Sequence, residues 1–446
     1  MSADKPKSAT NSSLPETLAG NYFVSAYPPF SSWQREQVSE LHKMLQTPPM
    51  ASAETPLGLY VHIPFCEIRC MYCYYLSLVK RTTEQVDDYI DAILQELSRY
   101  QQSSILAGRQ LEFVYFGGGT PSILTPEQIA KLTSGIQARF PWQQVKEVTF
   151  ECAPRTVTAE KLQQLKKAGV TRLSLGVQQF NDEILRLNGR VHLISDVERA
   201  YELIQKANFQ VVNLDLMVGL LGENDDTFLT SLEQIIRMAP DSVTIYQLEI
   251  PFNTPLYREL SSGKLRDYPP SWDEKRGRLS RGFLKLQQAQ YQIRSAYTAA
   301  RSARARRFIY QDEQYHGADL LGIGASAFSY LQGLHFQNRP PVDAYLQILQ
   351  EQQLPVERAY PLSENERMVR EFVLQLKLGS VQGRYFQEKF QVDVFERFRQ
   401  TIRNFSRQGF MQQKGDRLIL TLEGLLRVDR LLPNFYLPRH QGVRYS

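Results

Sequence analysis

The chain has 446 residues, 42% hydrophobic and 22% charged, which predicts more than one domain with a sizeable core. Its 52 Lys and Arg against 47 Asp and Glu give a net charge of +5, which implies no extended nucleic-acid-binding surface. Four cysteines cannot form a disulfide scaffold, no segment has the roughly 18 apolar residues of a membrane span, and the first twenty residues lack a signal-peptide core, so we expect a cytoplasmic globular protein.

The N-terminal region divides into a tail and an arm. Residues 1–20 are polar and predict a disordered tail. Residues 21–56 predict an arm and linker: the segment 21–33 is aromatic and contains two prolines, 34–45 has the pattern of a short helix, and 47–55 has the composition of a linker. An apolar segment without helical or strand period cannot build its own core, so we expect the arm to pack on the body of the protein.

From residue 57 onward, short apolar runs alternate with amphipathic stretches. The predicted strands are 58–63, 112–116, 147–151, 172–177, 210–216 and 243–248, and the predicted helices between them are 84–99, 126–139, 159–168, 196–206 and 226–238. Six βα units favour an α/β fold built as a partial (β/α)6 barrel over residues 57–300. A doubly wound sheet has the same pattern and stays an alternative. In the barrel, we expect the N-terminal arm to close over the mouth.

The remainder of the chain has a different texture. Residues 272–300 predict a long charged helix, and 320–327 predict a strand that runs into a glycine turn, within a barrel extension at 301–362. Residues 363–446 predict a small C-terminal domain. Its helices at 364–378 and 397–407, followed by a short strand pair near 415–424 and a final helix, are typical of a winged-helix-like helical domain.

Three cysteines lie in the segment Tyr60-Val-His-Ile-Pro-Phe-Cys66-Glu-Ile-Arg-Cys70-Met-Tyr-Cys73, a C-x3-C-x2-C pattern. The segment follows the first predicted strand, so it lies at the carboxyl end of a parallel sheet, where α/β proteins place their sites. A structural zinc site takes four protein ligands, and only three cysteines are present here. A [4Fe–4S] cluster with one open iron fits three thiolates better; zinc and three unpartnered thiols are the alternatives.

These residues resemble the radical S-adenosylmethionine superfamily, and within it the oxygen-independent coproporphyrinogen III oxidase family with its relative, the heme chaperone. The resemblance continues through Phe116-Gly-Gly-Gly-Thr-Pro-Ser122, Leu173-Ser-Leu-Gly-Val-Gln178, Asn213-Leu-Asp-Leu-Met-Val-Gly219 and Leu321-Gly-Ile-Gly-Ala325. It implies a [4Fe–4S] cluster and S-adenosylmethionine as cofactors. It also implies a radical oxidoreductase that acts on a tetrapyrrole, most specifically by oxidative decarboxylation of coproporphyrinogen III to protoporphyrinogen IX.

The resemblance also implies roles for single residues. Cys66, Cys70 and Cys73 would hold the cluster. The cofactor-binding residues would be Tyr60, Tyr72, Gly118, Gly119, Thr120, Glu151, Gln178, Arg190 and Asp215. Because a guanidinium binds a carboxylate through two parallel hydrogen bonds, Arg190 suits the carboxylate of the cofactor. Cys152 follows Glu151 on a predicted strand and therefore faces the other way, so we interpret it as a core residue.

Two features divide the family resemblance. The aromatic arm, with Tyr22, Phe23, Tyr27 and Phe30, resembles the true oxidases. Those oxidases carry Cys-x-Cys from the third cluster cysteine, whereas this chain has Cys73-Tyr74-Tyr75, and the segment Tyr246-Gln-Leu looks more like the chaperone branch. A heme-binding chaperone without turnover, and a radical methylase or cyclase acting on another substrate, stay open as alternatives.

Arginines at 294, 301, 304, 306 and 307 form one local basic concentration. They could receive the propionates of a coproporphyrinogen, or they could form a solvated helix face. The expected partners are a tetrapyrrole or related small molecule and a low-potential electron donor, with neither nucleic acid nor membrane. The sequence leaves the donor, the substrate and the oligomeric state open.

Overall fold

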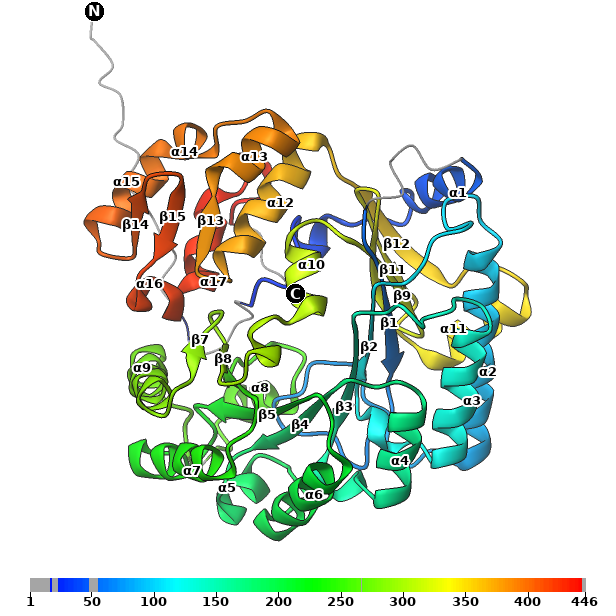
Figure 1. Cartoon of the computed structure of the whole chain (residues 1–446), viewed down its shortest axis with the longest axis horizontal. Coiled ribbons are helices and arrows are strands. Elements are labelled where there is room, and N and C mark those ends of the chain that lie inside the picture. Colours follow the sequence, from blue (N-terminus) through cyan, green and yellow to red (C-terminus); the bar gives the residue numbers. More distant parts are fainter. Residues whose placement is uncertain (1–16, 18–22, 48–54, 266, 443–446) are drawn as a thin grey trace, which may run out of the picture.

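The computed structural model of the chain describes Thr17 and residues 23–47, 55–265 and 267–442. The described residues form one twelve-stranded sheet and one three-stranded sheet (Figure 1). The predicted tail 1–20, apart from Thr17, and most of the predicted linker 47–55 lie outside the described residues. No helix among the described residues has the length and apolar character to cross a bilayer.

Six parallel strands occupy the centre of the large sheet, which confirms the predicted partial barrel. In spatial and chain order they are β1 Leu57–Ile63, β2 Phe113–Gly118, β3 Glu147–Cys152, β4 Arg172–Gln178, β5 Val211–Val218 and β6 Ser242–Gln247. A further parallel strand, β9 Asp319–Ile323, pairs with β1 on its outer side. The strands form an open arc in Figure 1, so their carboxyl ends share one mouth.

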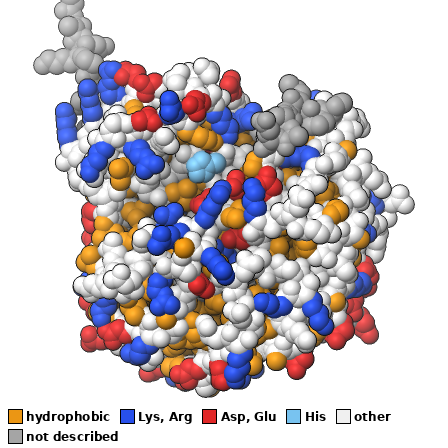
Figure 2. Space-filling view, viewed as in Figure 1, with side chains coloured by type: hydrophobic (Ala, Val, Ile, Leu, Met, Phe, Trp, Pro, Cys, Tyr) orange, Lys and Arg blue, Asp and Glu red, His pale blue; other side chains and the backbone are white. Residues whose placement is uncertain are grey.

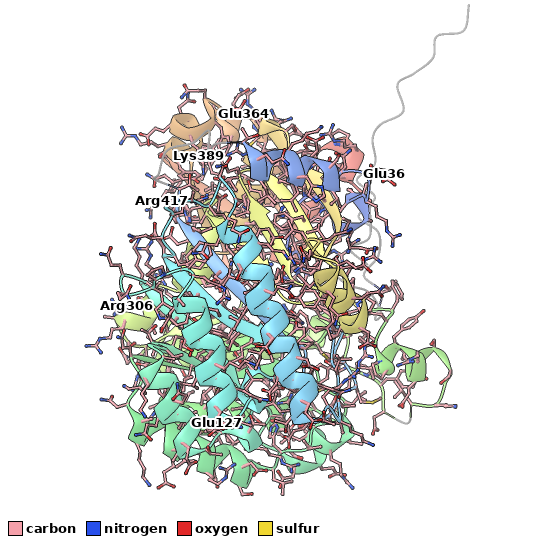
Figure 3. The ribbon with its side chains drawn as sticks, turned by 90° about the vertical axis from the view of Figure 1, so that its right-hand side faces the viewer. Glu36, Glu127, Arg306, Glu364, Lys389 and Arg417 are labelled. Carbon is pink, nitrogen blue, oxygen red and sulfur yellow. The ribbon has the colours of Figure 1, made fainter. Side chains whose placement is uncertain are left out.

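Helices cover the outer face of this arc (Figure 1). They are α2 Thr83–Gln101, α3 Pro126–Gln137, α4 Ala159–Lys167, α5 Asp182–Leu187, α6 Ile194–Ala207 and α7 Asp225–Met238. In α2, Thr82 closes a capping box, and Val86, Ile90, Ile93 and Leu97 lie buried against the sheet. Figure 3 shows α2 and α3 side by side, with Glu127 in the first turn of α3. The apolar faces of these helices and the sheet form the main core.

The predicted long helix 272–300 is wrong in its second half. Helix α9, Trp272–Gln288, ends before Gln290, which has a left-handed φ of 67°. The chain then forms β7 Gln292–Ile293 and β8 Thr298–Ala300, and β8 pairs antiparallel with β6. Because the left-handed turn involves a glutamine, neither glycine nor proline signals the end of this helix in the sequence.

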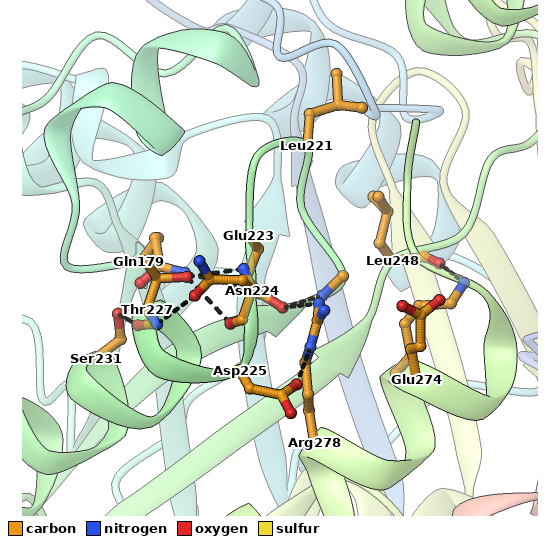
Figure 4. A network of polar contacts seen from close by, with 12 residues as sticks. Gln179, Leu221, Glu223, Asn224, Asp225, Thr227, Ser231, Leu248, Glu274 and Arg278 are labelled. Carbon is orange, nitrogen blue, oxygen red and sulfur yellow. Dashed lines mark hydrogen bonds and ion pairs between the residues drawn. The ribbon is translucent and has the colours of Figure 1, made fainter. Parts of the chain in front are cut away.

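Helix α9 is fixed to the barrel by buried charge. Arg278 donates to Glu223 Oε1 over 3.1 Å and to Asp225 Oδ1 over 2.9 Å (Figure 4). Glu223 also accepts from the backbone N–H of Gly219 over 2.8 Å, at the end of β5. The buried Lys275 donates to the Leu248 carbonyl over 2.9 Å, just beyond β6. Arg278 and Lys275 of α9 therefore hold the segments that follow the last two barrel strands.

On the other side, β10 Phe328–Leu331, β11 Leu334–Asn338 and β12 Val356–Pro361 extend the sheet with antiparallel strands beyond β9. Helix α11, Val342–Gln350, follows β11, and α1, Val38–Gln46, contacts the same strands. Helix α8, Pro255–Ser261, lies in the loop after β6, and α10, Ile309–Tyr315, lies between the arc and the C-terminal helices (Figure 1).

The C-terminal region has the order of a winged helix. Its elements are α12 Glu364–Leu376, β13 Ser380–Gln382, α13 Gly383–Phe390, α14 Val394–Arg397, α15 Arg399–Arg407, β14 Met411–Lys414, β15 Arg417–Leu420, α16 Leu422–Leu426 and α17 Val428–Leu431. The sheet order is β13-β15-β14. Figure 3 places Arg417, Lys389 and Glu364 together at this end of the molecule. The division of the chain into five parts stays a prediction.

The N-terminal arm shares the core of this C-terminal region. Val24 and Tyr27 are fully buried among residues of α12, α15 and α17. The Tyr27 hydroxyl lies 2.9 Å from His440 Nδ1, and Trp33 stacks on His335 of β11 at 4.8 Å between ring centroids. The ring of Tyr27 lies in this core, whereas Phe23 lies 5.4 Å from Tyr297 between ring centroids, so closure of the arm over the barrel mouth stays a prediction. Tyr22 lies outside the described residues.

Candidate active site

The three cysteines of the C-x3-C-x2-C segment lie in the loop that follows β1. All three are half-buried free thiols. Each sulfur has a polar neighbour: Thr120 Oγ1 lies 3.4 Å from Cys66 Sγ, Arg190 Nη1 lies 3.3 Å from Cys70 Sγ, and Ser77 Oγ lies 3.5 Å from Cys73 Sγ. Hydrogen bonds to sulfur are the contacts that stabilise thiolates bound to an inorganic cluster.

The arrangement fits a centre larger than a single ion. Among the described residues, no three His, Cys, Asp or Glu side chains lie close enough together to hold one metal ion. Burial raises the pKa of the Cys66 and Cys73 thiols, and their hydroxyl neighbours lower it. Three thiols on one loop, with a donor beside each, fit a [4Fe–4S] cluster and do not fit a four-ligand zinc site.

The glycine turn after β2 packs directly on the cysteine loop. Gly119 N–H donates to the Ile63 carbonyl over 2.8 Å, and Thr120 N–H donates to the Phe65 carbonyl over 2.8 Å. A Cβ on Gly119 would lie 2.8 Å from the Phe65 carbonyl oxygen and 2.9 Å from Cys66 Sγ. Gly118 has a φ of 115°, which only glycine adopts readily. The turn therefore needs glycine to approach the loop, whatever else it binds.

Two half-buried carboxyl groups face the interior of the barrel from β3 and β5, the strands on either side of β4. Burial raises the pKa of Glu151, in β3, to about 7, against a hydrogen bond from Tyr115 that lowers it. Burial likewise raises the pKa of Asp215, in β5, to about 6. Asp215 accepts from Ser174 Oγ over 2.9 Å and from Asn213 Nδ2 over 2.8 Å. Neither carboxylate has an ion-pair partner within the described residues, so both are suited to a cationic ligand.

Arg190 lies between these carboxylates and the cysteines. Its Nη2 donates to the Gly176 carbonyl over 2.9 Å, and its charge acts on both Asp215 and Tyr72. Gln178 ends β4 at a bulge with a left-handed φ of 69°, and its amide lies beside Gly176. A non-glycine residue in this conformation is strained, and such strain gathers at functional sites.

Tyr60 is the predicted site residue on β1. Its hydroxyl lies 2.9 Å from His62 Nδ1. The structure thus brings Tyr60, Tyr72, Glu151, Gln178, Arg190 and Asp215 to the same side of the sheet as the cysteine loop and the glycine turn. Their roles as cofactor contacts stay predictions.

Cys152 faces away from this group, as strand alternation predicts. It is 6% exposed within the main core, and burial raises its pKa to about 12. The side chain of the preceding Glu151 points into the barrel. Cys152 is therefore a core residue in the structure.

Sequence reasoning missed a group of tyrosines that lines the barrel interior. Tyr75, Tyr115, Tyr246 and Tyr310 all lie close enough to Glu151 for their charges to interact. Tyr75 is 48% exposed and Tyr246 is 42% exposed, although burial raises the pKa of both phenols, so both face an open recess. The signal in the sequence is strand alternation, since Tyr115 and Tyr246 occupy inward positions, but the pattern does not say which face is inward.

The arginines at 294–307 do not join the site. The Arg301 N–H donates to the Asp241 carbonyl before β6, and the Arg307 carbonyl accepts from Arg172 at the start of β4. Arg301 and Arg307 lie at the amino ends of the strands, whereas the cysteines follow a carboxyl end. Figure 3 shows Arg306 at the edge of the molecule, apart from Glu127. The segment is not a helix face either, because β8 and a short 3-10 turn occupy it.

On the face in Figure 2, Lys and Arg side chains are interspersed with Asp and Glu. This distribution agrees with the small net charge of the chain.

Comparison with known proteins agrees with this geometry. Residues 60–235 match the Radical SAM superfamily, and residues 362–427 match the HemN C-terminal domain. The chain is 30% identical over 373 residues to the heme chaperone HemW of Bacillus subtilis, covering 82% of this chain and 96% of that one. It is also 30% identical over 337 residues to the oxygen-independent coproporphyrinogen III oxidase of Escherichia coli, covering 72% of each chain.

The fold has a close counterpart among solved structures. The structure of coproporphyrinogen III oxidase (HemN) from Escherichia coli superposes with a TM-score of 0.80 at 24% identity, covering 93% of this chain and 96% of that one. With the [4Fe–4S] cluster and S-adenosylmethionine as its cofactors, the chain belongs to the radical SAM superfamily, in the family that contains the heme chaperone HemW and oxygen-independent coproporphyrinogen III oxidase.

Proposed function

We propose that this protein cleaves S-adenosylmethionine reductively and acts on a tetrapyrrole, with oxidative decarboxylation of coproporphyrinogen III to protoporphyrinogen IX as the specific reaction. Cys66, Cys70 and Cys73 hold the cluster in this proposal. Held there, the cluster would supply the one electron that reductive cleavage of the sulfonium C–S bond of S-adenosylmethionine requires. The observation that carries the proposal is the meeting of the cysteine loop, the glycine turn and two half-buried carboxylates at one barrel mouth.

In this proposal, different residues around the cysteines bind different groups of S-adenosylmethionine. Arg190 would bind the carboxylate of S-adenosylmethionine. Its guanidinium group lies beside the cysteine loop, with Nη1 near Cys70 Sγ and Nη2 at the Gly176 carbonyl. Gly118, Gly119, Thr120 and Glu151 would receive the ammonium group. Gln178, Asp215, Tyr60 and Tyr72 would surround the remainder. The two partly exposed tyrosines of the interior, Tyr75 and Tyr246, would exclude water from the radical and offer flat faces to a macrocycle.

A second function is favoured by one observation. Tyr75 stands two residues after the third cysteine, where the oxidases carry a thiol, and its ring stacks on Tyr74 at 4.4 Å between centroids. A protein that binds heme and delivers it without turnover would need no thiol there. A radical methylase or cyclase on another substrate stays the third candidate. We place the protein in the cytoplasm, where thiols stay reduced and where a low-potential electron donor can reach it.

The test separates these functions directly. Anaerobically reconstituted protein is incubated with S-adenosylmethionine, dithionite and coproporphyrinogen III, and the release of CO2 and formation of protoporphyrinogen IX are measured. The Cys73→Ala variant serves as the control for background chemistry. Turnover in the parent alone supports the oxidase. Tight binding of heme without conversion of coproporphyrinogen III contradicts the oxidase and supports the chaperone, whereas 5′-deoxyadenosine without protoporphyrinogen IX points to another substrate.

A further inference from the structure

Tyr115 makes the strongest contact to Glu151 in the barrel interior. The Tyr115 hydroxyl donates to Glu151 Oε1 over 2.6 Å, and the Gly118 N–H donates to Glu151 Oε2 over 3.3 Å. Both donors belong to β2, while Glu151 belongs to β3, and the two strands run in parallel register with Tyr115 opposite Thr149. Strand β2 therefore donates one hydrogen bond to each oxygen of the Glu151 carboxylate. The remaining lone pairs of the two oxygens face the interior.

The surrounding rings hold Tyr115 in this orientation. Its ring contacts Tyr310 of α10 at 4.3 Å and Tyr60 of β1 at 6.0 Å between centroids. Gly117 makes the room that the pair needs. A Cβ at that position would lie 2.7 Å from Tyr115 Cε1 and 3.1 Å from Glu151 Oε1. The absence of a side chain at Gly117 thus leaves room for the Tyr115–Glu151 pair, whereas its absence at Gly119 leaves room for the cysteine loop.

The groups that face Glu151 are mostly neutral at pH 7. They are Tyr60 from β1, Tyr75 from the cysteine loop, Tyr115 from β2, Asp215 from β5, Tyr246 from β6 and Tyr310 from α10. Of these, Asp215 opposes ionisation of Glu151, and the Tyr115 hydrogen bond favours it. The ionised form of Glu151 at neutral pH therefore depends on the donor that Tyr115 provides.

We propose that Tyr115 is a positioning residue that keeps the Glu151 carboxylate ionised and aimed at the cationic part of S-adenosylmethionine. The inference rests on the proposed function, in which Glu151 contacts the cofactor. Tyr115 itself touches Glu151 and has no assigned contact with the cofactor or substrate. Its removal should weaken cofactor binding by changing the charge state of Glu151, so the effect should depend on pH.

The test compares Tyr115→Phe with Tyr310→Phe in the reconstituted protein. Both variants lose one phenol hydroxyl in the same aromatic stack, but only the first loses a bond to Glu151. The dissociation constant of S-adenosylmethionine is measured between pH 6 and 9. Tyr115→Phe should weaken binding at pH 7 by about threefold to tenfold. Its affinity should recover toward that of the parent at pH 9, whereas Tyr310→Phe should follow the parent throughout.

A second readout does not need the cofactor. The infrared carbonyl band of protonated Glu151, identified by its loss in Glu151→Gln, reports the ionisation of that group. Tyr115→Phe should move its titration to higher pH. Gly117→Ala, which pushes the pair apart without removing the hydroxyl, should move it in the same direction and covers the case in which Tyr115→Phe does not fold.

The outcomes distinguish the inference from the proposed function. If Glu151→Gln weakens cofactor binding while Tyr115→Phe and Gly117→Ala change neither the affinity nor the titration, the role of Tyr115 is overturned and the cofactor site stands. If Glu151→Gln binds S-adenosylmethionine like the parent, the assignment of Glu151 fails, and the inference about Tyr115 fails with it.

Discussion

Two glutamates with a raised pKa lie on opposite sides of the barrel sheet, Glu151 on β3 at its inner face and Glu96 on helix α2 outside it. Glu96, on the outer side, accepts from the Gly324 N–H over 2.9 Å, Asn338 Nδ2 over 2.6 Å and the Tyr345 hydroxyl over 2.6 Å. Glu151, on the inner side, accepts only from β2. Burial raises the pKa of both to about 7. A raised pKa alone therefore does not mark a site; what marks it is the open lone pairs that face the interior.

The largest expected effect is the loss of iron when a cysteine on the inner side of the sheet is replaced, compared with a cysteine on the outer side. Changing Cys66, Cys70 or Cys73 to Ala should abolish the cluster, because three thiolates hold it and none can be replaced from the described neighbours. Iron content should fall from about four per chain to the background, along with the visible absorption band.

Cys152→Ala is the matched control, since Cys152 lies on the outer face. It should keep the cluster, with at most a moderate loss of thermal stability from the small cavity. Loss of iron in this variant would mean that the ligands are assigned to the wrong face.

The next prediction compares the two ends of the strands. Arg190→Ala, at the carboxyl end, should weaken S-adenosylmethionine binding by one to two decades, because a charge-assisted contact contributes about 1.5–3 kcal/mol. Asp215→Ala should act in the same direction, and both variants should keep their iron. Arg301→Ala, at the amino end, should bind like the parent in equilibrium binding measurements. Parent-like binding by Arg190→Ala and Asp215→Ala would contradict the placement of the cofactor.

A smaller effect is expected on the free energy of unfolding, which Glu96 and Glu151 make dependent on pH. The native state keeps the proton of each up to about pH 7, whereas the unfolded chain loses it near the ordinary value of about 4.5. Each therefore makes stability fall as pH rises between these values. Glu151→Gln should remove the contribution of Glu151 to this pH dependence. The free energy of unfolding at pH 8 should rise by about 1–3 kcal/mol, because a neutral amide replaces a charge in the barrel interior.

Glu96→Gln should behave in the opposite way at pH 8. Its three partners are all donors, so the new NH2 group faces a donor and stability should fall by about 1–3 kcal/mol. Denaturant midpoints of the reconstituted proteins at pH 5.5 and 8 provide the measurement. Equal responses of the two variants would remove the distinction between the faces.

The smallest effect should come from Ser77. Its hydroxyl lies 3.5 Å from Cys73 Sγ and 4.0 Å from Cys66 Sγ. Removing a hydrogen bond to cluster sulfur makes the oxidised form relatively more stable, so Ser77→Ala should lower the reduction potential by roughly 20–60 mV while iron content stays unchanged. A redox titration followed by electron paramagnetic resonance measures this shift. An unchanged potential would show that the hydroxyl does not act on the cluster.

The parallel core could be predicted from the sequence because six short apolar runs alternate with amphipathic stretches. The end of α9 could not, since Gln290 adopts a left-handed turn without glycine and the chain then pairs β8 with β6, a contact between distant segments. The cysteines and the glycine turn were visible as motifs. The Tyr115–Glu151 pair was not, because the contact depends on the register of β2 and β3 and on which face of the sheet closes inward. The burial of Tyr27 against His440 depends on two ends of the chain that no local pattern connects.

The contacts between the arm and the C-terminal region determine when the arm can be buried during synthesis. The Val24 N–H donates to Asp429 across 405 residues, and the buried Lys377 donates to the Val24 carbonyl over 2.6 Å. The arm is synthesised before the barrel, whereas its binding partners in α12 and α17 are synthesised after the barrel. Contacts of such separation are slow to form, and apolar segments that wait for them are exposed to aggregation. Val24 and Tyr27 can therefore be buried only after α12 and α17 have been synthesised, so these two apolar residues stay exposed longer than those of the barrel core.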